Sequence, residues 1–327
     1  MLSFLRFFVA TVFGVGLGCR TETEQRVIGV VPKGANHIYW QTVHAGAIKA
    51  ANEAGYRVEW NAPTLEVDAS RQIEIVESMV NRKLKGVVLA PVDRKALVAI
   101  VERGAREGVP VAVFDSALDT LQRVSYVATD NTEGGRIAAR RVAEILGGKG
   151  KVAIIGFIPG SGATMEREDG FQDEMQRKYP GIAIVALRYA KADRAKAMAE
   201  TENVLTAHPD LAAVFADNES SSSGAVQALK GRNARQVKMV AFDASEQLMQ
   251  DCRDGWIDSL VVQDPFKMGY ESTRALLRHL QGEKVEPRID SGVRLVKREE
   301  IDSLALKELL FPDIQKYLKS ATAGGGH

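Results

Sequence analysis

From residue 27 onward, short apolar runs alternate with amphipathic stretches of helical length. The apolar run Val27–Val31 has the length of a buried strand. Trp40, Val43 and Ala47 then recur at helical spacing, and a second strand-like run, Tyr56–Trp60, follows. Further strands and helices alternate in the same way along the chain, with short connections between them. This order predicts repeated βαβ units and a parallel sheet.

The pattern restarts after residue 128, and each half contains an apolar run that ends in Phe-Asp. Val109–Phe114 leads into Asp115, and Lys238–Phe242 leads into Asp243. Continuous apolar runs are typical of parallel strands covered on both faces. Ligands of open α/β sheets bind beyond the carboxyl ends of the strands, where both acids would lie. We therefore predict an α/β fold with two Rossmann-like lobes, each built on a parallel sheet, that face one cleft.

The chain must cross between the two lobes, and three segments are candidates for the strands of a hinge. They are Ala128–Asn131, Gln263–Pro265 and Asp290–Arg294. The expected domains are a signal peptide (1–19), a linker (20–26), an N-terminal lobe (27–128 plus 264–290), a C-terminal lobe (129–263 plus 291–300), a C-terminal helix extension (301–320) and a disordered tail (321–327). A helix-like pattern over Ser303–Tyr317 accounts for most of the extension.

The first residues carry a targeting signal rather than a part of the fold. The apolar run Phe7–Gly18 is too short to span a bilayer comfortably and fits the core of a signal peptide. It ends in Leu17-Gly18-Cys19, which resembles the bacterial lipoprotein signal, although the Leu usually stands one position earlier. We expect Cys19 to be lipidated and to become the mature N-terminus. The second cysteine, Cys252, then has no disulfide partner, and we expect it to be packed in the core.

Composition narrows the functional classes. The chain has 327 residues, 45% apolar and 26% charged, with a formal net charge of +1. This length allows two domains, and the balanced charge without a basic block argues against a nucleic-acid partner. With five histidines and no HxxxH or His/Cys cluster, we expect no metal site and no cofactor.

The loop after the first predicted strand presents polar and aromatic side chains to the crevice. Asn36, His37, Tyr39 and Trp40 lie here. Aromatic faces pack on the C–H groups of a sugar ring, while neighbouring polar groups pair with its hydroxyls. Trp40 also fits the inner face of its helix as a core residue, whereas Tyr39 lies off that face.

Other strand ends and helix starts supply hydrogen-bonding groups. Asn218 and Gln263 follow apolar strands and can both donate and accept, and Asp115 and Asp243 are strong acceptors for hydroxyls. Arg167 offers donors in a fixed geometry, although an exposed Arg paired with Glu is the alternative interpretation. No nucleophile and base are arranged for catalysis, so we expect a protein that is not an enzyme. Two acids on different lobes leave a glycosidase as an alternative.

Taken in order, these residues resemble the periplasmic ribose-binding protein family, the type I (cluster B) sugar-binding proteins of ABC importers. The resemblance runs from about Val27 to about Val296. The stretches that carry it are His37-Ile-Tyr-Trp-Gln, Val113-Phe-Asp115, Thr129-Asp-Asn131, Arg167-Glu-Asp-Gly-Phe171, Val204-Leu-Thr-Ala-His-Pro-Asp210, Val214-Phe-Ala-Asp-Asn218, Ala241-Phe-Asp243 and Val261-Val-Gln263.

The resemblance implies a periplasmic or cell-surface protein that binds a monosaccharide or sugar alcohol by hinge closure and presents it to ABC permease subunits. Tyr39 and Trp40 would be the aromatic contacts. Asp115, Arg167, Asn218, Asp243 and Gln263 would bind hydroxyls. The chain would be a monomer, attached to the membrane only through its lipid. A sensor or chemoreceptor is an alternative partner. Sugar-responsive repressors share the two-lobe module, but they carry a basic helix-turn-helix domain where this chain has a hydrophobic signal.

Three positions depart from the family's ribose binders. His37 stands where they have Asn, Ser116 where they have Arg, and Ala192 where they have Phe. Loss of an Arg and of an aromatic ring implies a larger pocket with fewer donors. A different pentose, a hexose or a sugar alcohol is therefore a better candidate than ribose.

Overall fold

A computed structural model describes residues 26–35 and 37–323. The predicted signal peptide, the lipidation site Cys19 and the candidate ligand residue Asn36 lie outside the described residues.

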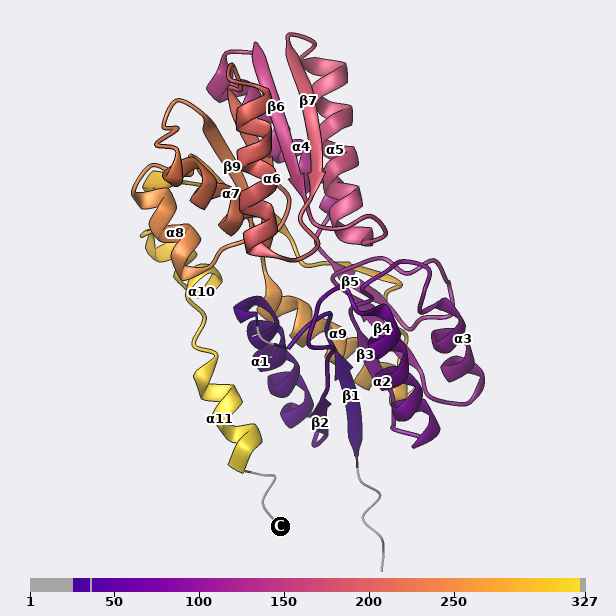
Figure 1. The fold of residues 1–327 in the computed structure, drawn as a ribbon. Helices are drawn as coiled ribbons and strands as arrows, with labels where there is room; N and C mark the ends of the chain where they lie inside the picture. Colours follow the sequence, from indigo (N-terminus) through magenta and orange to yellow (C-terminus); the bar gives the residue numbers. More distant parts are fainter. Residues whose placement is uncertain (1–25, 36, 324–327) are drawn as a thin grey trace, which may run out of the picture.

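Two six-stranded sheets form the centres of two lobes (Figure 1). The N-terminal lobe contains, in spatial order, β11 (Arg288–Asp290), β5 (Tyr126–Ala128), β4 (Val111–Phe114), β3 (Val87–Leu89), β1 (Val27–Val31) and β2 (Arg57–Trp60). The C-terminal lobe contains β12 (Val293–Lys297), β10 (Ser259–Gln263), β9 (Lys238–Phe242), β8 (Ala213–Ala216), β6 (Gly150–Gly156) and β7 (Ile182–Tyr189). All strand pairs are parallel except β10 with β12. The predicted α/β fold with two lobes and parallel sheets is confirmed.

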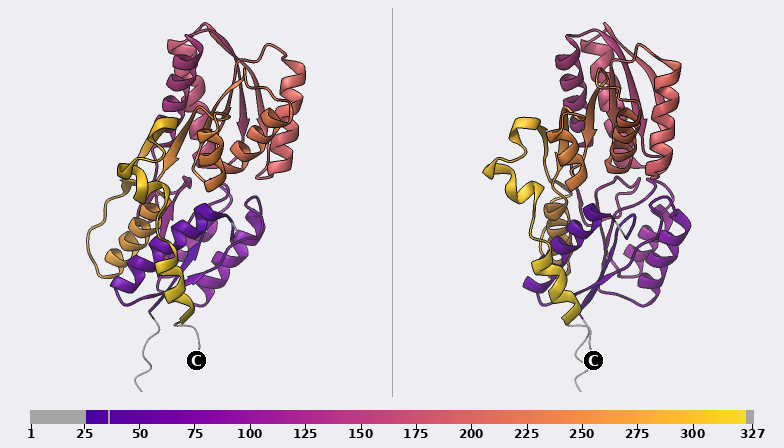
Figure 2. Two further views of the ribbon diagram at one scale, coloured as in Figure 1. Left: turned by 90° about the vertical axis from the view of Figure 1, so that its left-hand side faces the viewer. Right: turned by 60° about the vertical axis from the view of Figure 1, so that its left-hand side comes forward.

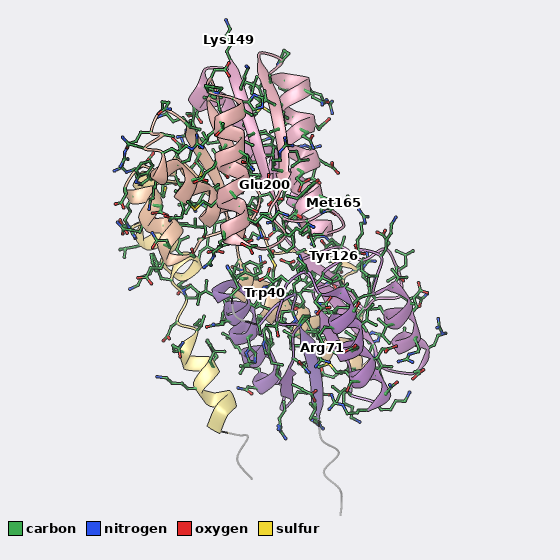
Figure 3. All side chains as sticks on the ribbon, viewed as in Figure 1. Trp40, Arg71, Tyr126, Lys149, Met165 and Glu200 are labelled. Carbon is green, nitrogen blue, oxygen red and sulfur yellow. The ribbon has the colours of Figure 1, made fainter. Side chains whose placement is uncertain are left out.

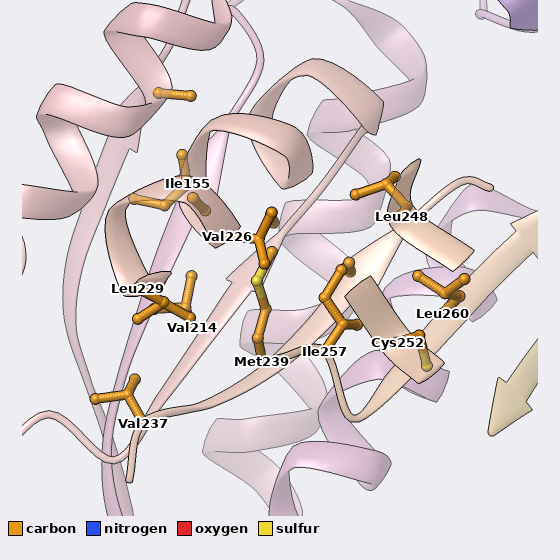
Figure 4. Close-up of a cluster of buried hydrophobic side chains, with 14 of the residues drawn as sticks. Ile155, Val214, Val226, Leu229, Val237, Met239, Leu248, Cys252, Ile257 and Leu260 are labelled. Carbon is orange, nitrogen blue, oxygen red and sulfur yellow. The ribbon is translucent and has the colours of Figure 1, made fainter. Parts of the chain in front are cut away.

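Helices cover both faces of each sheet, which explains why the strands are continuous apolar runs. In the N-terminal lobe, one face carries α1 (Ile38–Glu53) and α9 (Pro265–Leu280), and the other carries α2 (Ala69–Asn81) and α3 (Val98–Arg106). In the C-terminal lobe, α4 (Asn131–Leu146) and α5 (Gly162–Lys178) cover one face, and α6 (Arg194–Ala207), α7 (Glu219–Gly231) and α8 (Glu246–Arg253) cover the other. Figure 4 shows the core on this last face, which includes the fully buried Cys252, as predicted.

Local sequence determines where many helices begin. The side chains of Asp68, Asp130, Asp193, Asn218, Ser245 and Asp264 each accept a backbone N–H from the first turn of the following helix. Short polar side chains satisfy donors that the helix itself leaves unpaired. Because these caps follow the carboxyl ends of strands, they place helix N-termini at the edge of each sheet that faces the other lobe.

The chain passes between the two sheets three times. It crosses from β5 to α4, from β10 to α9, and from β11 to β12. Each crossing is short. The first and third crossings are in contact, with the hydroxyl oxygens of Thr129 and Ser291 3.3 Å apart, and Lys267, after the second crossing, donates to the Ser291 carbonyl at 3.3 Å. These segments lie side by side and form the narrow connection between the lobes.

The continuous helix predicted over Ser303–Tyr317 is wrong. The chain instead forms two 3₁₀ turns (Arg298–Glu300 and Leu304–Leu306), the short helix α10 (Lys307–Leu310) and then α11 (Gln315–Ala323). Pro312 explains the interruption, because proline disfavours helical backbone at the residue before it. That residue, Phe311, has φ −135° and ψ 56°. Helix α11 also extends into residues 321–323, which were expected to be disordered.

None of the helices within residues 26–35 and 37–323 is long and apolar enough to cross a membrane.

Candidate functional site

A polar cavity lies between the two lobes, beyond the carboxyl ends of the strands. It contains about 440 Å³ of space free of protein atoms, part of which is open to solvent. Its wall includes eight residues predicted from sequence: His37, Tyr39, Trp40, Asp115, Arg167, Asn218, Asp243 and Gln263. Figure 3 labels Trp40 and Met165, which lie near the junction of the lobes, one in each lobe.

The two Phe-Asp strand ends adopt the same unusual backbone. Asp115 follows β4 with φ 61°, and Asp243 follows β9 with φ 72°. Strands β4 and β9 hold the same place in their sheets, third from the edge formed by β11 or β12. Left-handed backbone is uncommon for residues other than glycine, although Asp tolerates it better than most. The shared conformation turns both carboxylates from their strand ends toward the same cavity.

The Asp115 carboxylate is held entirely by its own lobe. Its Oδ1 accepts from the Tyr39 hydroxyl at 2.8 Å, and its Oδ2 accepts from Lys33 Nζ at 2.8 Å and Ser116 Oγ at 3.1 Å. Burial alone would raise the pKa of Asp115, but the charge and hydrogen bond of Lys33, with smaller effects of the Arg167 charge and the Tyr39 hydrogen bond, outweigh it, and the net shift is downward. Asp115 is therefore ionised and fixed in position before any ligand arrives.

Asp243, in contrast, is held by uncharged donors. Its Oδ1 accepts from Gln263 Nε2 at 2.6 Å, and its Oδ2 accepts from the Glu219 backbone N–H at 3.0 Å. Burial raises the pKa of Asp243, and the nearby Arg167 offsets only part of this effect. The remaining amide oxygen of Gln263, Oε1, is buried without a hydrogen-bond partner. A buried acceptor of this kind costs free energy unless a donor reaches it.

Arg167 is buried rather than exposed, so its interpretation as a surface Arg paired with Glu is wrong. Its Nε donates to Asn131 Oδ1 at 2.9 Å, and its Nη1 donates to the Asp217 carbonyl at 2.8 Å. The guanidinium lies over the Phe242 ring, 3.8 Å from the centroid. These contacts present a rigid cation to the cavity from the second turn of α5.

His37 links the lobes at the edge of the cavity. Its Nε2 lies 2.6 Å from Glu219 Oε2, and Glu219 also accepts from Arg194 at 2.9 Å. His37 Nδ1 accepts the Tyr39 backbone N–H at 3.1 Å, so the proton on the other nitrogen points toward Glu219. Burial would raise the pKa of Glu219, but the His37 and Arg194 contacts lower it to about 2.

Aromatic rings form the apolar part of the wall. Tyr39 and Trp40 meet edge to face, with centroids 4.8 Å apart. The Trp40 indole N–H donates to Glu66 Oε1 at 2.8 Å, which fixes the ring although Trp40 is also part of the core. Phe157, from the loop after β6, lines the cavity from the C-terminal lobe.

Two predicted residues do not line the cavity. Ser116 is fully buried behind Asp115, where its Oγ accepts from Lys33 at 2.6 Å and from the Ala163 N–H at 3.3 Å. Ala192 lies in the turn between β7 and α6 with φ 59°. Elsewhere in the wall, Lys33 supplies a cation beside Asp115 and Phe157 supplies an aromatic ring.

Sequence reasoning missed six polar or aromatic wall residues: Lys33, Glu66, Phe157, Thr164, Glu219 and Ser220. Lys33, Phe157 and Glu219 each lie within three residues after a strand that had been recognised, so strand-end position was the available signal. Glu66 lies further along the loop between β2 and α2, and no local pattern indicates its place.

Two α/β lobes joined by three crossings around a polar cavity define a bilobal ligand-binding protein. A family model described as a periplasmic binding protein domain matches residues 28–284, and the chain belongs to this family.

Similarity to known proteins and to solved structures covers most of the chain. The ribose import binding protein of Bacillus subtilis is 30% identical over 272 residues, which cover 83% of this chain and 87% of that protein. A carbohydrate transporter solute-binding protein from Agrobacterium radiobacter, crystallised with D-arabinose, has a TM-score of 0.85 at 34% identity and covers 88% of this chain and 99% of its own. An ABC transporter solute-binding protein from Agrobacterium vitis with bound D-fucose has a TM-score of 0.85 at 32% identity, covering 87% and 100%.

Proposed function

We propose that this protein binds a monosaccharide or sugar alcohol between its lobes and delivers it to the membrane subunits of an ABC importer. The observation that carries the proposal is the pair of Phe-Asp strand ends, which bring one carboxylate from each lobe to one cavity. The sugar ligands of the similar proteins support the same class.

The residues of the wall suit an uncharged ligand rich in hydroxyls. Asp115, Asp243 and Asn218 would accept or donate at hydroxyls, Arg167 would donate, and the unpaired Gln263 Oε1 would accept from one of them. The Tyr39, Trp40 and Phe157 side chains, all in the wall, would pack on the ring C–H groups.

On balance, charge in the wall disfavours acidic sugars, because among the described residues two carboxylates without a cationic partner outnumber the one cation without an anionic partner, Arg167. Asp243 and Glu66 both face the cavity. Asp243 accepts from the Gln263 amide and Glu66 from the Trp40 indole N–H, and neither of these donors is a cation. A uronate or sugar phosphate would bring a like charge close to these carboxylates, at a cost that burial increases. The preferred ligand is therefore a neutral pentose, hexose or polyol.

Binding would work by closing the hinge. The lobes already touch around the cavity, through His37 with Glu219 and through the Arg94 N–H, which donates to the Gly160 carbonyl at 3.0 Å. A ligand that contacts both lobes favours this closed arrangement, because those contacts exist together only when the lobes meet.

The family places the protein outside the cytoplasm, and we propose that a lipid on Cys19 holds it at the membrane surface. The intact mass of the protein purified from a bacterial host with lipoprotein processing tests this proposal. A mass that begins at residue 19 and includes a diacylglyceryl group is expected, and Cys19→Ser should remove it. Cleavage elsewhere with no added lipid would contradict it.

The sugar proposal is tested by thermal shift over a panel of pentoses, hexoses, polyols and uronates. We expect one or a few neutral sugars to raise the melting temperature and uronates to have no effect. Asp243→Asn should abolish the sugar-induced rise while it keeps the apo melting temperature within a few degrees, since Asn tolerates the left-handed backbone. Glu299→Ala, at an exposed carboxylate outside the cavity, is the control. A panel without any response, or an unchanged response in Asp243→Asn, would contradict the proposal.

A further inference from the structure

The last described segment forms a fourth link between the lobes. We name residues 301–319 the strap. At its start, Ile301, Leu306 and Leu310 are 1%, 1% and 7% exposed and belong to the core of the C-terminal lobe, together with Leu248 and Cys252 of α8 (Figure 4). This end of the strap is thus part of the hydrophobic core rather than a surface tail.

An ion pair reinforces this first anchor. Arg253, in the last turn of α8, donates through Nε and Nη2 to Asp302 Oδ1 at 3.2 and 2.7 Å. The pair is partly exposed and adds little stability by itself, but it holds the start of the strap against α8.

The other end of the strap rests on the N-terminal lobe. Helix α11 packs against α1, and the Tyr317 ring lies 5.5 Å from the Phe266 ring at the start of α9. Ile314 is 8% exposed and shares a cavity wall with Ile38 and Thr42 of α1. Figures 1 and 2 show the two ends on different lobes, with α10 near α8 and α11 beside α1.

Between the anchors, the strap spans a hollow next to the ligand cavity. Residues 309–314, except the exposed Asp313, line one side of this hollow. The opposite side includes Tyr39, Asp243 and Gln263, which also line the ligand cavity. The middle of the strap therefore lies close to the ligand-binding side chains, but it is held mainly at its two ends.

We propose that the strap limits the opening of the lobes and favours the closed form. Opening the hinge must separate the two anchors or pull one of them off its lobe. Only four residue steps join Leu310 to Ile314, and they span at most about 14 Å when fully extended. Because the apparent affinity scales with the fraction of molecules in the binding-competent form, the strap would also tighten ligand binding.

The test removes the second anchor and leaves the first in the core. The variant Ile314→Ser/Tyr317→Ser keeps the chain length, and a second variant ends the chain after Leu310. Gln315→Ser, an exposed position on the same helix, is the matched control. For each protein, small-angle X-ray scattering without sugar gives the radius of gyration, and calorimetry with the best sugar of the panel gives the Kd.

We expect both anchor variants to have a larger apo radius of gyration than the parent and the control, and a Kd raised about three- to tenfold. An unchanged apo radius of gyration in both variants would refute the proposal that the strap limits the opening of the lobes. A larger radius of gyration with an unchanged Kd would refute the proposal that the strap tightens ligand binding. The affinity arm rests on the proposed sugar-binding function, whereas the scattering arm does not. If no sugar binds, the function fails and the scattering still decides on the strap.

Discussion

Lys33 was not recognised in the sequence, and its removal is the sharpest test of the site's electrostatics. Lys33→Met keeps a flexible chain of similar length but removes the charge 2.8 Å from Asp115 Oδ2. Both side chains are 5% exposed. Breaking a buried ion pair by removing one partner costs about 3–5 kcal/mol. Because the Tyr39 and Ser116 hydroxyls still donate to Asp115, we expect the lower end, about 3 kcal/mol.

The same change should reverse the response of Asp115 to pH. In the parent protein the pKa of Asp115 is lowered, so its ionised form stabilises the fold above its unfolded pKa, and this contribution is lost as the pH falls through the folded pKa. Lys33 provides the two largest effects that lower this pKa, so without it we expect burial to outweigh the remaining effects of Arg167 and Tyr39 and the pKa to rise above the unfolded value. At pH 7 the variant is then destabilised by a buried carboxylate that has lost its cationic partner, whereas near pH 4 this carboxylate can be protonated. Its deficit in stability should therefore shrink as the pH is lowered.

Urea unfolding of the apo protein at pH 7 and pH 4, followed by circular dichroism, measures this deficit. The double variant Lys33→Met/Asp115→Asn is the control, since Asn has the shape of Asp and no charge to leave unpaired. It should recover a large part of the stability lost at pH 7. A deficit that is equal at both pH values, or a double variant no more stable than Lys33→Met, would refute the reasoning.

Two further changes test the packing behind the site. Asp217 and Glu168 are buried neighbours that interact with each other, and burial raises the pKa of both. While both are ionised, one carboxylate oxygen of each has no hydrogen-bond donor. Asp217→Asn should therefore raise the unfolding free energy by about 1–3 kcal/mol at pH 8 and by less at pH 4, where a protonated carboxyl can donate to its neighbour, and a larger gain at pH 4 would contradict this explanation. A Cβ at Gly135 would lie 2.0 Å from the Arg167 carbonyl oxygen, so Gly135→Ala should displace α5, lower the melting temperature and weaken sugar binding. Gly231→Ala, with open space around the new Cβ, is the control and should do neither. Equal effects of the two substitutions would show that close packing at Gly135 is not the cause.

Periodicity was sufficient to predict the fold because both faces of each sheet are covered. The strand β8, Ala213–Ala216, is apolar along its whole length, and helices flank it on both sides. The same reasoning did not predict the structure of the C-terminal extension, residues 301–320. Its apolar positions fit a helix, but a single Pro312 divides it, and its two parts bury their apolar side chains on different lobes.

Residues that line the cavity could be predicted where they follow a strand end, but not where their place depends on contacts between distant parts of the chain. Asp115 and Asp243 could be found because each directly follows an apolar run. The role of Lys33 could not, because it depends on a contact with Ser116, 83 residues away in the chain. Similarly, the absence of Arg at position 116 suggested fewer donors, whereas the structure places Lys33, from the end of β1, in the same region.

The partners of the two acids explain how the site can open without losing its shape. Asp115 is held by Lys33, Tyr39 and Ser116 of its own lobe, and Asp243 by Gln263 and the Glu219 backbone of the other. Opening the hinge therefore breaks none of the bonds that orient either carboxylate. It costs only contacts between the lobes, such as that of His37 with Glu219 at the cavity edge. Each half of the site is thus preorganised before closure, and most of the binding free energy of a ligand remains available to shift the lobes toward the closed form.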